Sequence, residues 1–92
     1  MIVRISGEGQ YEMPDGVGDE LNELDNRVVA AVEDHDEVGF RHAFDALLAA
    51  VRRHGTELAA DDLRESTLII PPADTTLGEA ERDFTGDGLL PD

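Results

Sequence analysis

The chain has 92 residues, with 22 Asp and Glu against 7 Arg, no Lys and no Cys, and its formal net charge is -15 at pH 7. A chain this short supports one small hydrophobic core, so we interpret residues 1–92 as a single domain. The charge argues against direct binding to nucleic acid, and no apolar run approaches the roughly 20 residues that cross a bilayer. Because the N-terminus begins like a strand and carries no signal-peptide pattern, we expect a cytoplasmic protein without direct membrane insertion.

The absence of lysine and the high acidity indicate something about the organism in which the protein functions. This composition is typical of a GC-rich genome or of a cytoplasm that holds molar salt. Carboxylates keep a protein hydrated at high salt, where the Debye length falls to about 3 Å. We favour a halophilic host, because the charge exceeds what solubility requires. At low ionic strength, repulsion between the carboxylates should weaken the fold.

The first residues alternate between apolar and polar as in a β-hairpin. Residues 2–5 are typical of a strand, the sequence Ser-Gly-Glu-Gly at 6–9 is typical of a turn, and residues 10–13 are typical of a second strand. Apolar residues at 17, 21, 24, 28 and 32 then predict a helix over residues 16–34, with Asp15 as its N-cap. Gly16 and Gly18 disfavour the start of this helix by about 1 kcal/mol each.

A second series of apolar residues, at 40, 43, 44, 47, 48 and 51, predicts a helix with a wide apolar stripe. Asp36 is placed to cap its start, and residues 52–54, Arg-Arg-His, suit the negative end of its dipole. Gly55 is placed to end the helix in the left-handed conformation. Because the link between the two helices is so short, we expect an antiparallel helical hairpin.

Residues 67–70 predict a third short strand, which Pro71 and Pro72 end. Thr76 and Glu79 match a capping box and predict a short third helix that ends near Gly86. The order ββααβα predicts an α+β fold, in which the helical hairpin packs on one face of a small sheet. An open edge of that sheet could pair with a second copy, so a homodimer is a further expectation.

Two patterns in the sequence partly match known functional sites, namely a calcium-binding loop and a set of histidines, but neither match is complete. Residues 83–88, Asp-Phe-Thr-Gly-Asp-Gly, match the first half of a calcium loop, but the bidentate acidic ligand of position 12 is missing. The three histidines are spread out, with His35 and His54 some 28 Å apart at the two ends of one predicted helix at about 1.5 Å per residue, and His42 off its apolar stripe. No nucleophile motif is present either. We therefore predict no catalytic residue, no metal site and no cofactor.

The acidic surface is interpreted first as a solvated face, and second as a surface that recognises a basic or charge-mixed helical partner. Four apolar residues are candidates for contact with that partner because they could lie outside the core. They are Tyr11, Met13, Leu89 and Leu90.

Several segments of the sequence together resemble one known family. These are residues 1–11 (MIVRISGEGQY), 19–25 (DELNELD), Phe40-Arg41, 68–74 (LIIPPAD) and 86–91 (GDGLLP). They are similar to the PspA-associated domain, PspAA, over nearly the whole chain. The resemblance implies an accessory role beside PspA, the phage-shock protein that coats stressed membranes and belongs with the ESCRT-III-like coiled-coil proteins.

Three hypotheses follow. The first is a non-enzymatic adaptor of the membrane stress response, which binds a PspA-like coiled coil and reaches the inner membrane face only through that partner. The second is a cation-binding or salt-responsive sensor that uses Asp83, Asp87 and neighbouring carboxylates. The third is a small enzyme, which would require His42 or His54 to lie in a pocket with an acid.

Overall fold

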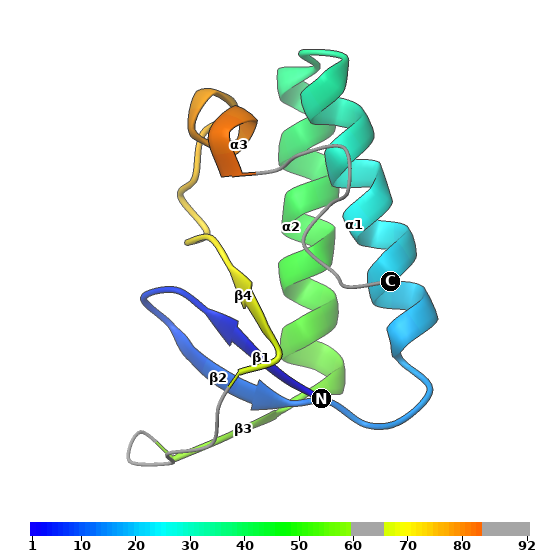
Figure 1. The fold of residues 1–92 in the computed structure, drawn as a ribbon, viewed down its shortest axis with the longest axis vertical. Helices are drawn as coiled ribbons and strands as arrows, with labels where there is room; N and C mark the ends of the chain where they lie inside the picture. Colours follow the sequence, from blue (N-terminus) through cyan, green and yellow to red (C-terminus); the bar gives the residue numbers. More distant parts are fainter. Residues whose placement is uncertain (60–65, 84–92) are drawn as a thin grey trace.

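The computed structural model describes residues 1–59 and 66–83, and within them the chain forms four strands and three helices (Figure 1). In chain order these are β1 (Ile2–Ile5), β2 (Gly9–Glu12), α1 (Gly18–Glu33), α2 (Glu37–His54), β3 (Thr56–Glu57), β4 (Leu68–Ile70) and α3 (Leu77–Asp83). The predicted α+β fold is confirmed, including the helical hairpin and the short third helix.

The sheet has the strand order β3-β2-β1-β4. β1 and β2 form the predicted antiparallel hairpin, in which Val3 lies opposite Tyr11. The predicted third strand is β4, which runs parallel to β1 and places Ile70 beside Ile5. β3 pairs antiparallel with β2 and was not predicted, because a strand of two exposed residues leaves no hydrophobic alternation in the sequence.

One face of the sheet is covered by the helical hairpin, as Figure 1 shows. The alternation along each strand sends every second side chain into the core under the helices. These side chains are Val3, Ile5, Tyr11, Leu68 and Ile70. Ile69 lies between two of them on the opposite face and is 57% exposed.

The apolar stripe of α2 is buried as its spacing predicts. The buried residues of this helix are Phe40, Phe44, Leu47, Leu48, Ala50 and Val51. The rings of Phe40 and Phe44 stack with their centroids 5.4 Å apart. From α1, Leu21 and Val28 complete the core without any exposure to solvent. Each of these large side chains contributes roughly 1.5–3 kcal/mol of hydrophobic free energy through its burial.

The start of α1 and the end of α2 each differ from the prediction in one respect. α1 begins at Gly18 with Val17 at its N-cap and no side-chain cap, so the prediction that Asp15 caps a helix from residue 16 is wrong. Gly16 has a φ of 89°, which lies outside the helical region and delays the start. Gly55 is extended, with φ -84° and ψ 157°, because the chain leaves α2 directly into β3. The predicted left-handed ending is therefore also wrong.

Two predicted caps are confirmed. The Asp36 carboxylate accepts a hydrogen bond from the backbone N–H of Gly39 at 2.9 Å and so caps α2. At α3, the Glu79 backbone N–H donates to the Thr76 hydroxyl, and the Glu79 carboxylate accepts from the Thr76 backbone N–H. This is the reciprocal pattern of a capping box. No helix within the described ranges is long and apolar enough to cross a membrane.

Candidate functional site

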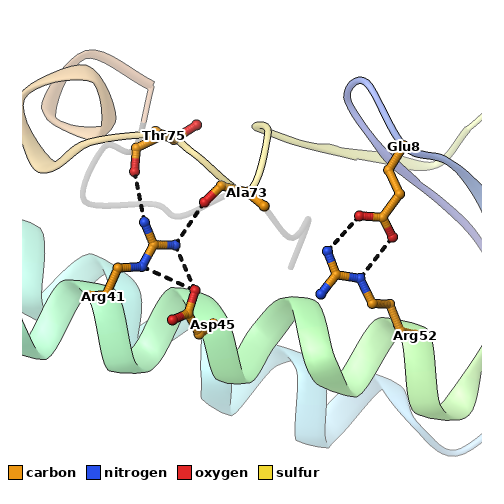
Figure 2. A network of polar contacts seen from close by, with 6 residues as sticks. All are labelled: Glu8, Arg41, Asp45, Arg52, Ala73 and Thr75. Atoms are coloured by element: carbon orange, nitrogen blue, oxygen red, sulfur yellow. Dashed lines mark hydrogen bonds and ion pairs between the residues drawn. The ribbon is translucent and has the colours of Figure 1, made fainter.

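Two arginines of α2 bind parts of the chain that are far away in sequence (Figure 2). Arg52 follows Arg41 by eleven residues, which is three helical turns, so both side chains lie on the same side of the helix. Arg41 reaches the loop that precedes α3, whereas Arg52 reaches the turn between β1 and β2. The two arginines thereby attach the sheet side and the α3 side of the molecule to one helix.

Arg41 makes the larger number of contacts. Its guanidinium donates to the backbone carbonyl of Ala73 at 3.0 Å and to that of Thr75 at 3.3 Å. It also donates to the Asp45 carboxylate from two nitrogens, at 2.7 and 3.1 Å. The same group lies 5.8 Å from the centre of the Phe40 ring and 5.3 Å from that of Phe44. We name this arrangement the Arg41 clasp, because it holds residues 73–75 against the aromatic part of α2.

Beside the clasp lies a hollow of ≈ 420 Å³ between the first turns of α2 and the start of α3. It is lined by Glu37, Val38, Phe40, Arg41, His42, Asp74, Thr75, Thr76 and Leu77. We call it the α2–α3 groove. Val38 is 70% exposed here, although it is a large apolar residue.

The charged residues that line the α2–α3 groove do not balance. The positive charge of Arg41 is matched by Asp45 in an ion pair of 2.7 Å. Glu37 and Asp74 also line the groove, and neither forms an ion pair with any residue in the described part of the chain. Within the described residues, the groove therefore combines apolar walls with two carboxylates that are not paired with a positive charge.

Arg52, Glu8 and Tyr11 form the second polar cluster. Arg52 forms a bidentate ion pair with the Glu8 carboxylate, with nitrogen–oxygen distances of 2.8 and 2.5 Å. The Tyr11 hydroxyl also donates a hydrogen bond to this carboxylate, at 2.7 Å. The bond from Arg52, aided by that from Tyr11, lowers the pKa of Glu8 from 4.5 to about 2. The bond to Glu8, together with burial, raises the pKa of Tyr11 from 10.0 to about 12. At neutral pH, Glu8 is thus a carboxylate and Tyr11 a neutral donor.

The three histidines lie at three different places. His54 contacts Glu20 at 2.7 Å and so joins the end of α2 to the start of α1. His35, in the turn between the helices, contacts Glu81 of α3 at 2.9 Å. His42 is exposed on α2. Among the described residues, no group of three or more potential ligands could hold a metal ion.

The family model described as PspA-Associated protein, PspAA, matches residues 1–92, which is the whole chain. The chain belongs to the PspAA family. No curated protein and no solved structure matches it. Two of the segments that resemble PspAA, Phe40-Arg41 and residues 68–74, meet at the Arg41 clasp, where Arg41 binds the carbonyl of Ala73.

Of the residues predicted to contact a partner of this PspAA protein, two are found in the core. Tyr11 is 7% exposed and Met13 is 3% exposed, so neither presents an appreciable surface in this conformation. Met13 follows β2 and continues its inward alternation after Tyr11. Leu89 and Leu90 lie outside the described residues, as does most of the calcium-loop pattern at 83–88.

Sequence reasoning did not find the Arg41 clasp or the α2–α3 groove. Two of the acceptors of Arg41 are backbone carbonyls more than thirty residues away. Every residue carries a backbone carbonyl, so no residue type in the sequence predicts which one accepts. Val38 could have been singled out from the sequence, because it is a large apolar residue that lies outside the apolar stripe of α2. An apolar residue outside the stripe of an otherwise amphipathic helix suggests a contact beyond the core.

Proposed function

We propose that this PspAA protein is a non-enzymatic accessory protein of the membrane stress response and binds a PspA-like coiled-coil protein. The observation that supports this is the match of the whole chain to a family described as PspA-associated. An adaptor needs a stable small fold and a surface, and 92 residues are enough for both.

The chemistry of the described residues fits a binding role. The side chains with the most contacts, Arg41 and Arg52, are hydrogen-bonded to other parts of the same chain. Arginines used in this way hold the fold together, and their positive charge is already matched by Asp45 and Glu8. The surface charge left over is acidic, which favours a partner with basic residues and speeds its association.

Any contact with the membrane should be indirect. A net charge of -15 is repelled by the negative surface potential of anionic lipids. We therefore propose that the protein is cytoplasmic and reaches the inner membrane face only when its coiled-coil partner is bound there.

The binding is tested with the purified protein and the purified PspA-like protein of the same genome, in buffer at the salt concentration of the host cytoplasm. Isothermal calorimetry should show saturable binding, and anionic vesicles should sediment the PspAA protein only when the PspA-like protein is present. The absence of a calorimetric signal at salt concentrations where both proteins are folded would overturn the proposal. Sedimentation with the vesicles alone would overturn the indirect route to the membrane.

Light scattering on the protein alone addresses the expected homodimer. β4 is an edge strand of the described sheet, and its three residues offer a short edge for pairing. A mass of about twice 10.0 kDa would support a dimer. A mass of about 10.0 kDa would show that the protein alone is a monomer and would contradict the expected homodimer.

A further inference from the structure

The α2–α3 groove presents the most exposed large apolar side chain in the described part of the chain. Val38 is 70% exposed, compared with 57% for Ile69 and 40% for Met1. Leu77, on the opposite wall, is only partly buried against the core. Leaving apolar walls open to water is unfavourable by about 25 cal/mol per Å², so a partner that covers them gains that free energy.

The groove is formed before any partner arrives. The Arg41 clasp fixes residues 73–75 against α2, and the capping box fixes the first turn of α3. Thr75, which belongs to the clasp and directly precedes the capping box, is only 3% exposed. A groove whose walls are already ordered spares its partner the entropy cost of ordering them on binding.

The charge around the groove selects the kind of partner. Glu37 and Asp74 line it and form no ion pair within the described residues, while Arg41 is matched by Asp45. A second copy of this chain also carries a charge of -15, so it would bring like charges together. A segment with a large apolar side chain flanked by Lys or Arg satisfies both the apolar walls and the two carboxylates.

We propose that the α2–α3 groove binds one basic, amphipathic helix of the coiled-coil partner, with a large apolar side chain packed against Val38 and basic side chains paired with Glu37 and Asp74. A helix can present one apolar and two basic side chains on the same face when they lie at positions i, i+3 and i+4, which are about one turn apart. This proposal rests on the proposed function, since it names the surface through which the coiled-coil protein is bound.

A second hollow, of ≈ 400 Å³, lies between α1 and α2 and provides the comparison. Half of the residues that line it are alanine or glycine, among them Ala30, Ala43 and Ala46. Ala46 is exposed on α2, as Val38 is, two turns further along the helix. The same substitution at these two positions adds the same charge to the same helix, but in different hollows.

The test compares Val38→Asp with Ala46→Asp by calorimetry against the purified PspA-like protein at host salt. Val38→Asp should weaken binding by about tenfold or more, because it places a charge at the centre of the contact. Ala46→Asp should leave the Kd within about twofold, which is the behaviour of a residue outside the contact. Both variants should unfold at nearly the same urea concentration as the wild type, because both side chains are exposed.

A second variant probes the charge and does not depend on Val38. Replacing Glu37→Gln together with Asp74→Asn should weaken binding and reduce its dependence on salt. If this double variant and Val38→Asp both bind like the wild type, the groove is not the interface and the proposal is overturned. If Ala46→Asp alone loses binding, the partner lies on the hollow between α1 and α2, which also overturns it.

Crosslinking gives a direct readout of contact, since the chain has no cysteine of its own. A photoreactive group attached to the Val38→Cys variant should crosslink to the PspA-like protein, at a helical segment rich in Lys or Arg. The Ala46→Cys variant should crosslink much less. Failure of the wild-type protein to bind at all would refute the proposed function, whereas wild-type binding with crosslinks only from position 46 would refute the groove alone.

Discussion

Arg41 stabilises the protein mainly through two backbone carbonyls, because its ion pair is largely in water. The side chain of Asp45 is 61% exposed, and exposed ion pairs on helices contribute only about 0.3–0.5 kcal/mol. Hydrogen bonds from a charged donor contribute about 1.5–3 kcal/mol when their partners would otherwise be left unsatisfied. The bond to Thr75 is of this kind, since Thr75 is buried, whereas the bond to Ala73 is exposed and contributes less.

Replacement of Arg41 by alanine should lower the free energy of unfolding by about 1–3 kcal/mol, as measured by urea denaturation at high salt. The loss of the two carbonyl bonds also frees residues 73–75 from α2. The matched control is Arg27→Ala, because Arg27 forms an ion pair with Glu23 on the same helix in which both side chains are exposed. That control should cost less than about 0.5 kcal/mol. Equal effects of the two substitutions would show that the clasp does not stabilise the fold.

Glu8 provides a prediction about pH. Its pKa in the folded protein is lowered from 4.5 to about 2, so the stability that its carboxylate contributes is complete above pH 4.5 and is lost as the pH falls toward 2. Glu8→Gln should therefore destabilise the protein by about 1–2 kcal/mol at pH 7, with less effect as acid is added. Urea denaturation of both proteins across this range measures the difference. A difference that does not change with pH would mean that packing is the cause, and not the charge of Glu8.

The single tyrosine offers an independent control for the Glu8 cluster. Because the chain has one Tyr and no Trp, the ultraviolet absorbance of tyrosinate reports Tyr11 alone. Its titration midpoint should lie at about 12 in the wild type, since its hydroxyl donates to the Glu8 carboxylate. In Glu8→Gln the midpoint should move toward the ordinary value of 10.0.

At the scale of the elements, spacing in the sequence predicted α2 nearly to the residue, because a stripe of apolar side chains at helical spacing has no other way to be buried. The caps at Asp36 and Thr76 were predicted because their partners lie three residues away. The start of α1 and the conformation at the end of α2 were not predicted correctly. Both depend on backbone angles that are set by where the chain must go next, into the core at Val17 and into β3 after Gly55.

Gly55 is required by a close approach between elements and not by an unusual backbone angle. A Cβ atom there would lie 2.7 Å from the backbone oxygen of Val51, 2.8 Å from the sulfur of Met13 and 2.8 Å from the Cβ of Tyr11. The joint between α2 and β3 is therefore packed directly onto β2.

Substitution of Gly55 by alanine should destabilise the protein by about 1–3 kcal/mol through this overpacking. The matched control is Gly18→Ala at the start of α1, where an added Cβ meets nothing within 4 Å. There the same change should be neutral or should stabilise the protein by up to about 1 kcal/mol, because alanine favours the helix. Thermal unfolding of the two variants checks the opposite signs. A stabilised Gly55→Ala variant would show that β2 and α2 separate easily at this joint.

At the scale of the whole molecule, composition predicted the acidic surface but not its distribution. Four arginines, namely Arg27, Arg41, Arg52 and Arg53, each pair with a carboxylate within the described residues. These four positive charges are thus matched by carboxylates of the same chain, in pairs that are largely exposed, and most of the remaining carboxylates lie on the surface. The candidate site could not be derived from the sequence because it depends on where α3 lies against α2, and that position is set by contacts between distant residues.

The net charge of -15 makes stability depend on salt. Raising KCl from 0.1 to 1 M shortens the Debye length from about 10 to about 3 Å and screens the repulsion among carboxylates, while buried contacts are hardly affected. The free energy of unfolding should rise by about 1 kcal/mol or more, which corresponds to an increase in Tm of roughly 4–8 °C. NaCl at the same ionic strength should act alike, because screening does not depend on the identity of the cation. A saturable rise with millimolar calcium would instead indicate a cation site, and a fall with KCl would mean that local pairs such as Arg52–Glu8 outweigh the repulsion.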